Sequence, residues 1–208
     1  MAEVAGLVMA AFPIIIEGLH LYVEGVESIK KWWSYVKTLK RLIRKLEMEK
    51  TKLENSCTEL LYDIVDEQTL SLLLEKPGGY RWREDSLQQA LRVRLDKSFS
   101  VYMGAIQDMK ETMDEFKDKL ELDADNKPRW TDYRAHKREW KRVHFCFCEH
   151  TIEELLDNLG KDNKDLADLL GHSQRMERIR LSKSTGNAKL ALRLRYTPQR
   201  EPKVGVPQ

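Results

Sequence analysis

Apolar residues recur at alternating steps of three and four along most of this chain. The clearest series begins at Ile29 and ends at Ile64, and only Lys50 interrupts it. This spacing puts the apolar side chains on one face of an α-helix, where they pack along its length. It predicts a long helix from about Val26 to Ile64, with a bend before it at Gly25. The series consists of Ile29, Trp32, Val36, Leu39, Ile43, Leu46, Leu53, Cys57, Leu60 and Ile64.

The strongest break in the chain is the sequence Lys76-Pro77-Gly78-Gly79, which predicts a turn. A short helix around Leu70–Leu74 is predicted before it. After the break, Ser86 with Gln89 forms a capping box, which would open a second long helix. The inner face of that helix would carry Leu87, Leu91, Leu95, Tyr102, Ile106, Met109, Met113, Phe116 and Leu120.

Two more helices are predicted after a polar turn at 123–128. Trp130, Tyr133, Trp140 and Phe147 keep the helical rhythm in the first of them. A second capping box, formed by Thr151 and Glu154, would open the other. The inner face of this last helix would carry Ile152, Leu155, Leu159, Leu166 and Leu170.

These elements predict an all-α fold, an antiparallel bundle of about five helices that includes two long ones. We expect the bundle to span residues 1–170. Residues 171–208 are rich in Ser, Gly, Pro and basic side chains, so we expect a basic, flexible tail or linker. Within it, the sequence KLALRLRY also fits a short strand or a basic helical turn.

Charge is distributed unevenly, although the net charge is only +2. Residues 30–52 hold nine Lys/Arg against two Glu, and residues 171–208 also hold nine against two. Such clusters attract phosphate groups of lipids or nucleic acids, or they form a solvated helix face. The C-terminal cluster has Tyr196 as its single tyrosine and no phenylalanine or tryptophan, so nucleic acid is not the favoured partner.

The first helix is unusually apolar. Val4–Ile16 is a run of 13 residues without a charge, whereas a membrane span needs about 20. Extending the run adds Glu17 and His20, and Pro13 interrupts it. Two interpretations remain: a central core helix, or a helix that is stored in the bundle and later enters a membrane. The basic cluster that follows would suit anionic headgroups.

Catalytic and metal-binding motifs are weak. The chain has no nucleophile elbow, P-loop or dinucleotide fingerprint, so we do not expect an enzyme or a cofactor. His144, Cys146, Cys148 and His150 form the one metal-like cluster. These side chains would share one side of a strand, but on the predicted helix they divide between two faces, so no metal site is expected. Three cysteines and no signal peptide favour a cytoplasmic protein.

Several stretches of the chain resemble one family. EVAGLVMAAFPIIIEGLHLYVEG, followed by KKWW and by TLKRLIRKLEMEKTKLENSCTELL, is similar to the N-terminal region of fungal HeLo-like proteins, including the prion-inhibition and propagation domains. The sequences LLLEKPGGYRW and DNKPRWTDYRAHKREWKR resemble an uncharacterised group of the same fungal proteins. The resemblance covers most of residues 1–170 and rests on overall pattern.

The resemblance implies a membrane-targeting domain of programmed cell death or an immune-like response. Its apolar first helix would be released on oligomerisation and would perturb the plasma membrane. A HeLo-like domain is usually one module of a longer protein with a sensor or regulatory part. The membrane-interacting residues would then be Val4, Leu7, Val8, Phe12, Ile14, Ile15 and Ile16.

The basic cluster after this helix would bind anionic lipid. Trp32 belongs to the inner apolar series, whereas Trp33 falls outside it and fits a contact at headgroup level or with another helix. The expected lipid-binding residues are Lys30, Lys31, Trp33, Lys37, Lys40, Arg41, Arg44 and Lys45. The alternative is a non-enzymatic interaction or scaffold domain, which would self-associate or mediate autoinhibition without membrane activity.

Overall fold

The computed structural model describes residues 2–27, 33–120, 122 and 149–184. In the described part of the chain, four long helices form a bundle: α1 (Ala2–Glu27), α2 (Trp33–Leu61), α5 (Phe99–Lys119) and α7 (Glu149–Ser184). Around the bundle, α1 packs on α2, α2 on α7, α7 on α5, and α5 on α1. The prediction of an all-α bundle is confirmed for the described part of the chain.

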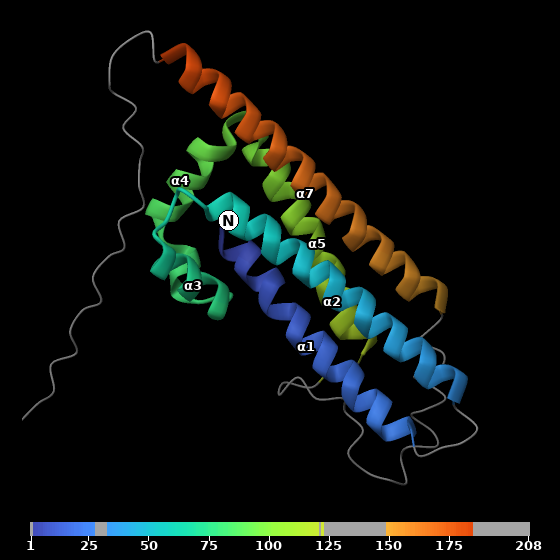
Figure 1. The fold of residues 1–208 in the computed structure, drawn as a ribbon. Coiled ribbons are helices and arrows are strands. Elements are labelled where there is room, and N and C mark those ends of the chain that lie inside the picture. Colours follow the sequence, from blue (N-terminus) through green and yellow to red (C-terminus); the bar gives the residue numbers. More distant parts are fainter. Residues whose placement is uncertain (1, 28–32, 121, 123–148, 185–208) are drawn as a thin grey trace, which may run out of the picture.

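The four long helices alternate in direction along the chain. In the bundle, α2 therefore runs parallel to its neighbour α7, and α1 runs parallel to its neighbour α5 (Figure 1). Arg41 and Glu153 meet near the start of α2 and α7, and Glu49 and Asn163 meet further along both helices. Tyr22 and Leu120 meet near the ends of α1 and α5. The bundle is therefore antiparallel in chain order and parallel at the α2–α7 and α1–α5 contacts.

A smaller unit of short helices links α2 to α5 and packs beside the N-terminal part of α1 (Figure 1). It consists of α3 (Glu67–Glu75), the 3-10 helix η2 (Tyr80–Arg83), α4 (Asp85–Leu95) and the 3-10 helix η3 (Asp96–Ser98). Between α3 and η2, Gly78 has a φ of 78°, a conformation that glycine adopts without strain. The predicted Pro-Gly-Gly break is confirmed.

The apolar series predicted from the sequence forms the core. In α2, the described members of the series from Val36 to Leu60 are all buried, and Ile64 is buried just beyond the helix. Every predicted inner position from Leu87 to Leu120 is buried as well, and so are the five predicted positions of α7. Three-four spacing therefore identified the inward faces correctly.

Several predicted boundaries are wrong. Val26 and Gly25 belong to α1, which continues to Glu27, and α2 ends at Leu61 rather than at Ile64. The helix predicted from Ser86 to Leu120 is divided at Asp96, where φ is 48° and the backbone leaves the helical region. The buried positions before and after this break still follow the three-four spacing, because α4 and α5 pack against the same core.

Neither capping box stands where it was predicted. Helix α4 begins at Asp85 with Glu84 as its N-cap, so Ser86 lies inside the first turn. Helix α7 begins at Glu149, two residues before Thr151. The N-cap that the sequence reading missed is Asp66, whose carboxylate accepts hydrogen bonds from the Thr69 N–H at 2.9 Å and the Thr69 hydroxyl at 2.8 Å.

The domain boundary expected after residue 170 falls inside α7, which continues to Ser184. Beyond Gly171, this helix still contacts the bundle. The Ser173 hydroxyl lies 3.4 Å from the Leu95 carbonyl oxygen, and Arg94 pairs with Glu177 at 2.8 Å. The predicted helix at 130–147, the four residues of the metal-like cluster as a set, and the sequence KLALRLRY lie outside the described residues.

Candidate functional site

Helix α1 is the most apolar of the long helices and the first candidate for a functional element. It packs against α2 and α5 along its length and against η2 and α4 near its N-terminus. Over Ala2–Glu24 it is long and apolar enough to cross a membrane, and half of the most apolar window is buried inside the bundle. The helix runs through Pro13, which lies on its exposed side. A core helix of a soluble bundle meets the same test of length and composition.

The seven residues predicted to contact a membrane divide between two sides of α1. Val8, Phe12 and Ile15 are completely buried in the core. Val4, Ile14 and Ile16 are half-buried, and Leu7 is exposed. In the folded bundle, α1 therefore presents only part of its apolar surface to the solvent, and the three most buried residues would reach a lipid only if α1 left its place.

Burial of α1 makes a large contribution to the stability of the bundle. Val8, Phe12, Ile15 and Leu19 are each fully buried, and burying one such side chain stabilises a fold by about 1.5–3 kcal/mol. Four of them contribute about 6–12 kcal/mol, which is comparable with the whole stability of a typical domain. Release of α1 into water is therefore strongly unfavourable, whereas transfer into hydrocarbon would recover much of this free energy.

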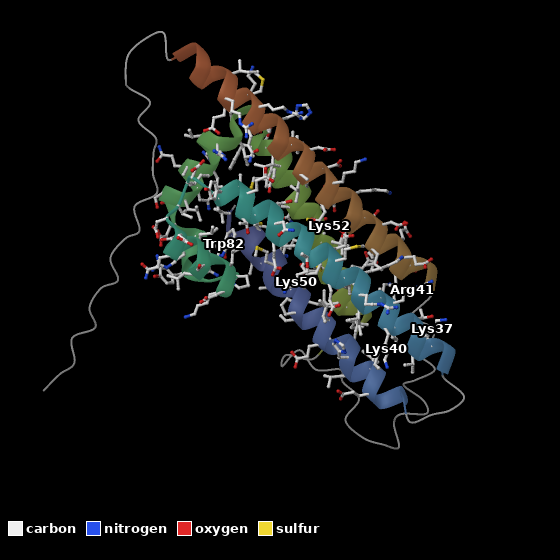
Figure 2. All side chains as sticks on the ribbon, in the orientation of Figure 1. Lys37, Lys40, Arg41, Lys50, Lys52 and Trp82 are labelled. Atoms are coloured by element: carbon white, nitrogen blue, oxygen red, sulfur yellow. The ribbon has the colours of Figure 1, made fainter. Side chains whose placement is uncertain are left out.

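The N-terminal end of α1 is fixed by a close contact with the unit of short helices. A Cβ atom at Gly6 would stand 2.7 Å from the Gly78 nitrogen and 2.8 Å from Trp82 Cγ, so only glycine fits there. The indole of Trp82, labelled in Figure 2, is buried and donates a hydrogen bond to the Leu73 carbonyl at 3.0 Å. Glu3 pairs with Arg83 at 2.9 Å on the surface beside this contact.

The C-terminal part of α1 is fixed to the end of α5. The buried Tyr22 hydroxyl donates a hydrogen bond to the Leu120 carbonyl at 2.7 Å. Gly18 faces Leu122, and a Cβ atom at this glycine would stand 3.1 Å from the leucine Cδ2. Neither this contact nor the Gly6 contact was predictable from the sequence, because both join segments that are far apart in the chain.

The basic cluster of α2 is the second candidate. Lys37, Lys40, Arg41 and Arg44 are exposed and Lys45 is half-buried. Figure 2 shows Lys37, Lys40 and Arg41 along the first half of α2, at the end of the bundle where α1 terminates. Lys30 and Lys31 lie outside the described residues, and so does the side chain of Trp33, the first residue of α2. The structure thus brings part of the predicted basic cluster beside the C-terminal half of α1.

One ion pair joins this cluster to α7. The Arg41 guanidinium lies 3.1 Å from a Glu153 carboxylate oxygen, and both side chains are about half exposed. An exposed pair of this kind contributes at most about 1 kcal/mol. The other exposed basic side chains of the cluster give the first half of α2 a positive surface, whose field extends about 8–10 Å at physiological salt.

Two buried titratable groups, Cys57 and Tyr102, have pKa values that burial raises. Burial raises the pKa of the Cys57 thiol to about 12, helped by the nearby charge of Glu54, so this thiol is not a nucleophile at neutral pH. Burial also raises the pKa of Tyr102 well above its usual range. Within residues 2–27, 33–120 and 149–184, no group of three or more His, Cys, Asp or Glu side chains could hold a metal ion.

Comparisons of the chain with protein-family models, with curated proteins and with solved structures find no match. The resemblance to HeLo-like proteins therefore stays a hypothesis, and the functional argument rests on the geometry of α1 and α2.

Proposed function

We propose that this chain is a membrane-acting helical bundle of the HeLo-like kind, from a fungal cell-death or immune-like protein. In this proposal α1 is stored in the bundle and is released on oligomerisation at the plasma membrane. The observation that carries it is that a helix with the length and composition of a membrane span packs one side into the core of the bundle and lies beside an exposed basic surface. The protein would be cytoplasmic before activation.

The two surfaces would act in sequence. The exposed part of the basic cluster on α2 would first hold the bundle at an anionic membrane, where each basic side chain near the surface contributes about 1 kcal/mol. Self-association there would then separate α1 from α2 and α5. The bilayer would accept the apolar side chains of α1, which the bundle would otherwise have to expose to water.

The test is dye release from phosphatidylglycerol vesicles. Deleting residues 1–23 is not informative, because α1 supplies a large part of the core. Instead, the double variant Leu7→Asp with Ile14→Asp puts charges on the outward side of α1, where Leu7 is exposed and Ile14 is half-buried. A charge costs about 2.5–3.5 kcal/mol at the centre of a membrane helix, so we expect this variant to release far less dye than the wild type.

The matched control is Val93→Asp with Val101→Asp, which adds the same charge at two exposed positions of α4 and α5. It should release dye like the wild type, and circular dichroism should show that both double variants remain folded. Equal dye release from both variants would contradict the proposal. If the wild type releases no dye, the membrane proposal is wrong and the interaction-domain alternative remains.

That alternative has one observation in its favour. Helix α1 contacts α2, α4, α5 and η2, so its removal would disrupt the packing of the whole bundle. A domain that functions only by binding other proteins would keep α1 in place permanently. Such a domain should form an oligomer of fixed stoichiometry whose formation is unaffected by anionic vesicles, a result that sedimentation would show.

A further inference from the structure

A groove between α2 and α7 has a volume of about 390 Å³ and lies outside the contacts of α1. Its lining combines two apolar side chains, Met48 and Leu156, with charged side chains of both signs. The two helices run in parallel here, joined by the contact between Glu49 and Asn163. The groove is therefore a fixed feature of the bundle surface.

The groove is lined by a carboxylate that is almost completely buried. The Glu49 side chain is only 7% exposed. Its Oε1 accepts a hydrogen bond from Lys52 Nζ at 2.8 Å, and its Oε2 accepts one from Asn163 Nδ2 at 2.8 Å. Asn163 also donates to the Glu49 carbonyl at 3.0 Å. A carboxylate has about four lone-pair positions, so this one is held in place and can still accept N–H groups from a ligand.

Gly160 of α7 lies next to this carboxylate. A Cβ atom there would stand 3.8 Å from Glu49 Oε1, which is ordinary contact, so packing does not require a glycine. Glycine inside a helix costs about 1 kcal/mol relative to alanine. Its effect is to leave the groove open beside the carboxylate, where a larger side chain would fill it.

The other charged residues of the lining are mainly basic. Lys45 comes from α2, Lys161 and Lys164 come from α7, and Asp157 offsets one of these three positive charges. Lysine ammonium groups attract phosphate as point charges. The groove therefore combines a buried hydrogen-bond acceptor, the Glu49 carboxylate that also pairs with Lys52, with several donors for an anion, a pattern that suits a ligand carrying both an N–H donor and a phosphate.

We propose that this groove binds a phosphoethanolamine group, the headgroup of an aminophospholipid. The primary ammonium donates hydrogen bonds to the Glu49 carboxylate, and the phosphate lies among Lys45, Lys161 and Lys164. The short ethylene link crosses Met48 and Leu156. This inference names the class of headgroup that the bundle recognises. The assumption that the headgroup belongs to a membrane lipid rests on the proposed membrane function.

The first arm of the test uses the full chain and soluble phosphoethanolamine, with binding followed by NMR shifts or calorimetry. Gly160→Leu should fill the groove and weaken binding by about tenfold or more, whereas Gly104→Leu should change nothing. Gly104 is a matched control because a Cβ atom there would meet nothing within 4 Å. Equal binding by both variants would overturn the proposal.

The second arm tests the role of the carboxylate. Phosphocholine carries a quaternary ammonium without N–H donors, so it should bind about tenfold more weakly than phosphoethanolamine, because it lacks the charged hydrogen bonds to Glu49. Glu49→Gln should reduce the preference between the two ligands and keep the fold, since glutamine still offers an oxygen to Asn163. If inorganic phosphate binds as tightly as phosphoethanolamine, the lysines alone are responsible and the proposal is wrong.

The third arm separates the lipid from the free headgroup. Two kinds of vesicle contain the same fraction of phosphatidylglycerol, and the remaining lipid is phosphatidylethanolamine in one and phosphatidylcholine in the other. The wild type should bind the phosphatidylethanolamine vesicles more tightly, and Gly160→Leu should abolish this difference. Binding of the soluble headgroup without this difference would overturn the lipid source. Dye release from pure phosphatidylglycerol does not involve the groove, so it tests the membrane proposal separately.

Discussion

Tyr22 links the last part of α1 to the end of α5 through its hydrogen bond to the Leu120 carbonyl. Replacing it with phenylalanine keeps the ring in the core and leaves a buried carbonyl without that donor. We expect Tyr22→Phe to lower the free energy of unfolding by about 1–2 kcal/mol, measured in urea. Under the membrane proposal, it should also increase dye release, because α1 is less firmly stored. Tyr62→Phe, at a side chain that is 64% exposed, is the control and should change neither quantity.

Asp162 gives the α5–α7 contact a dependence on pH. Burial, together with the charges of Asp108 and Asp165, raises the pKa of its carboxyl from 3.8 to about 6. The folded state therefore binds this proton more tightly than the unfolded state, so the ionised carboxylate destabilises the fold at pH 7. This destabilisation should decrease as the pH falls from 7 through 6 towards 4.

Asp162→Asn should remove this dependence. We expect the variant to be more stable than the wild type at pH 7, by less than about 1 kcal/mol because the group is only partly buried and solvent screens its charge, and the difference should vanish near pH 4. Urea unfolding at a series of pH values measures it. A difference that grows as the pH falls would contradict the assignment.

At the scale of single elements, α3 depends on its N-cap. Hydrogen bonds from the Thr69 N–H and then its hydroxyl lower the pKa of the Asp66 carboxyl below 3.8. This contribution is present above pH 3.8 and is lost as the pH falls through the lower pKa of the folded state. Asp66→Ala should destabilise α3 by about 1 kcal/mol at pH 7, seen as faster amide exchange in Glu67–Glu75. Gln68→Ala, an exposed neighbour, should leave exchange almost unchanged.

The inward faces of the helices were predictable, and their ends were not. Buried positions such as Leu39 and Ile106 follow from three-four spacing, which depends only on the local helical period. The ends depend on tertiary contacts. Asp96 interrupts an apolar series without changing its rhythm, and α7 continues past Gly171 because Ser173 and Glu177 contact the α4 segment.

The candidate site was predictable in part for the same reason. An uncharged run and a basic cluster are visible in the sequence, so α1 and Lys37–Lys45 could be named in advance. The sequence did not show which side of α1 faces the core, because the run is apolar on all sides of the helix. The Gly6–Trp82 contact and the groove beside Gly160 join residues separated by more than 70 positions. Such a contact leaves no signal in a single sequence.

In the whole molecule, α1 supports the packing of the bundle and is also the helix that the membrane proposal releases. Four fully buried side chains, including Phe12 and Leu19, hold α2 and α5 together, so release of α1 requires an acceptor as apolar as the core. The exposed part of the basic cluster lies at the end of the bundle where α1 terminates (Figure 2). We propose that an anionic membrane provides that acceptor.

The most direct test follows a single thiol on α1. Ala11 is buried, and Ala11→Cys is a small change that places a thiol there. Cys146 and Cys148 would be replaced by serine. The buried Cys57 of α2 then remains as an internal reference. We expect a lipid-soluble maleimide in phosphatidylglycerol vesicles to modify the thiol at position 11 much faster than Cys57, and we expect no modification in phosphatidylcholine vesicles. Protection of both thiols, or equal modification of both, would contradict it.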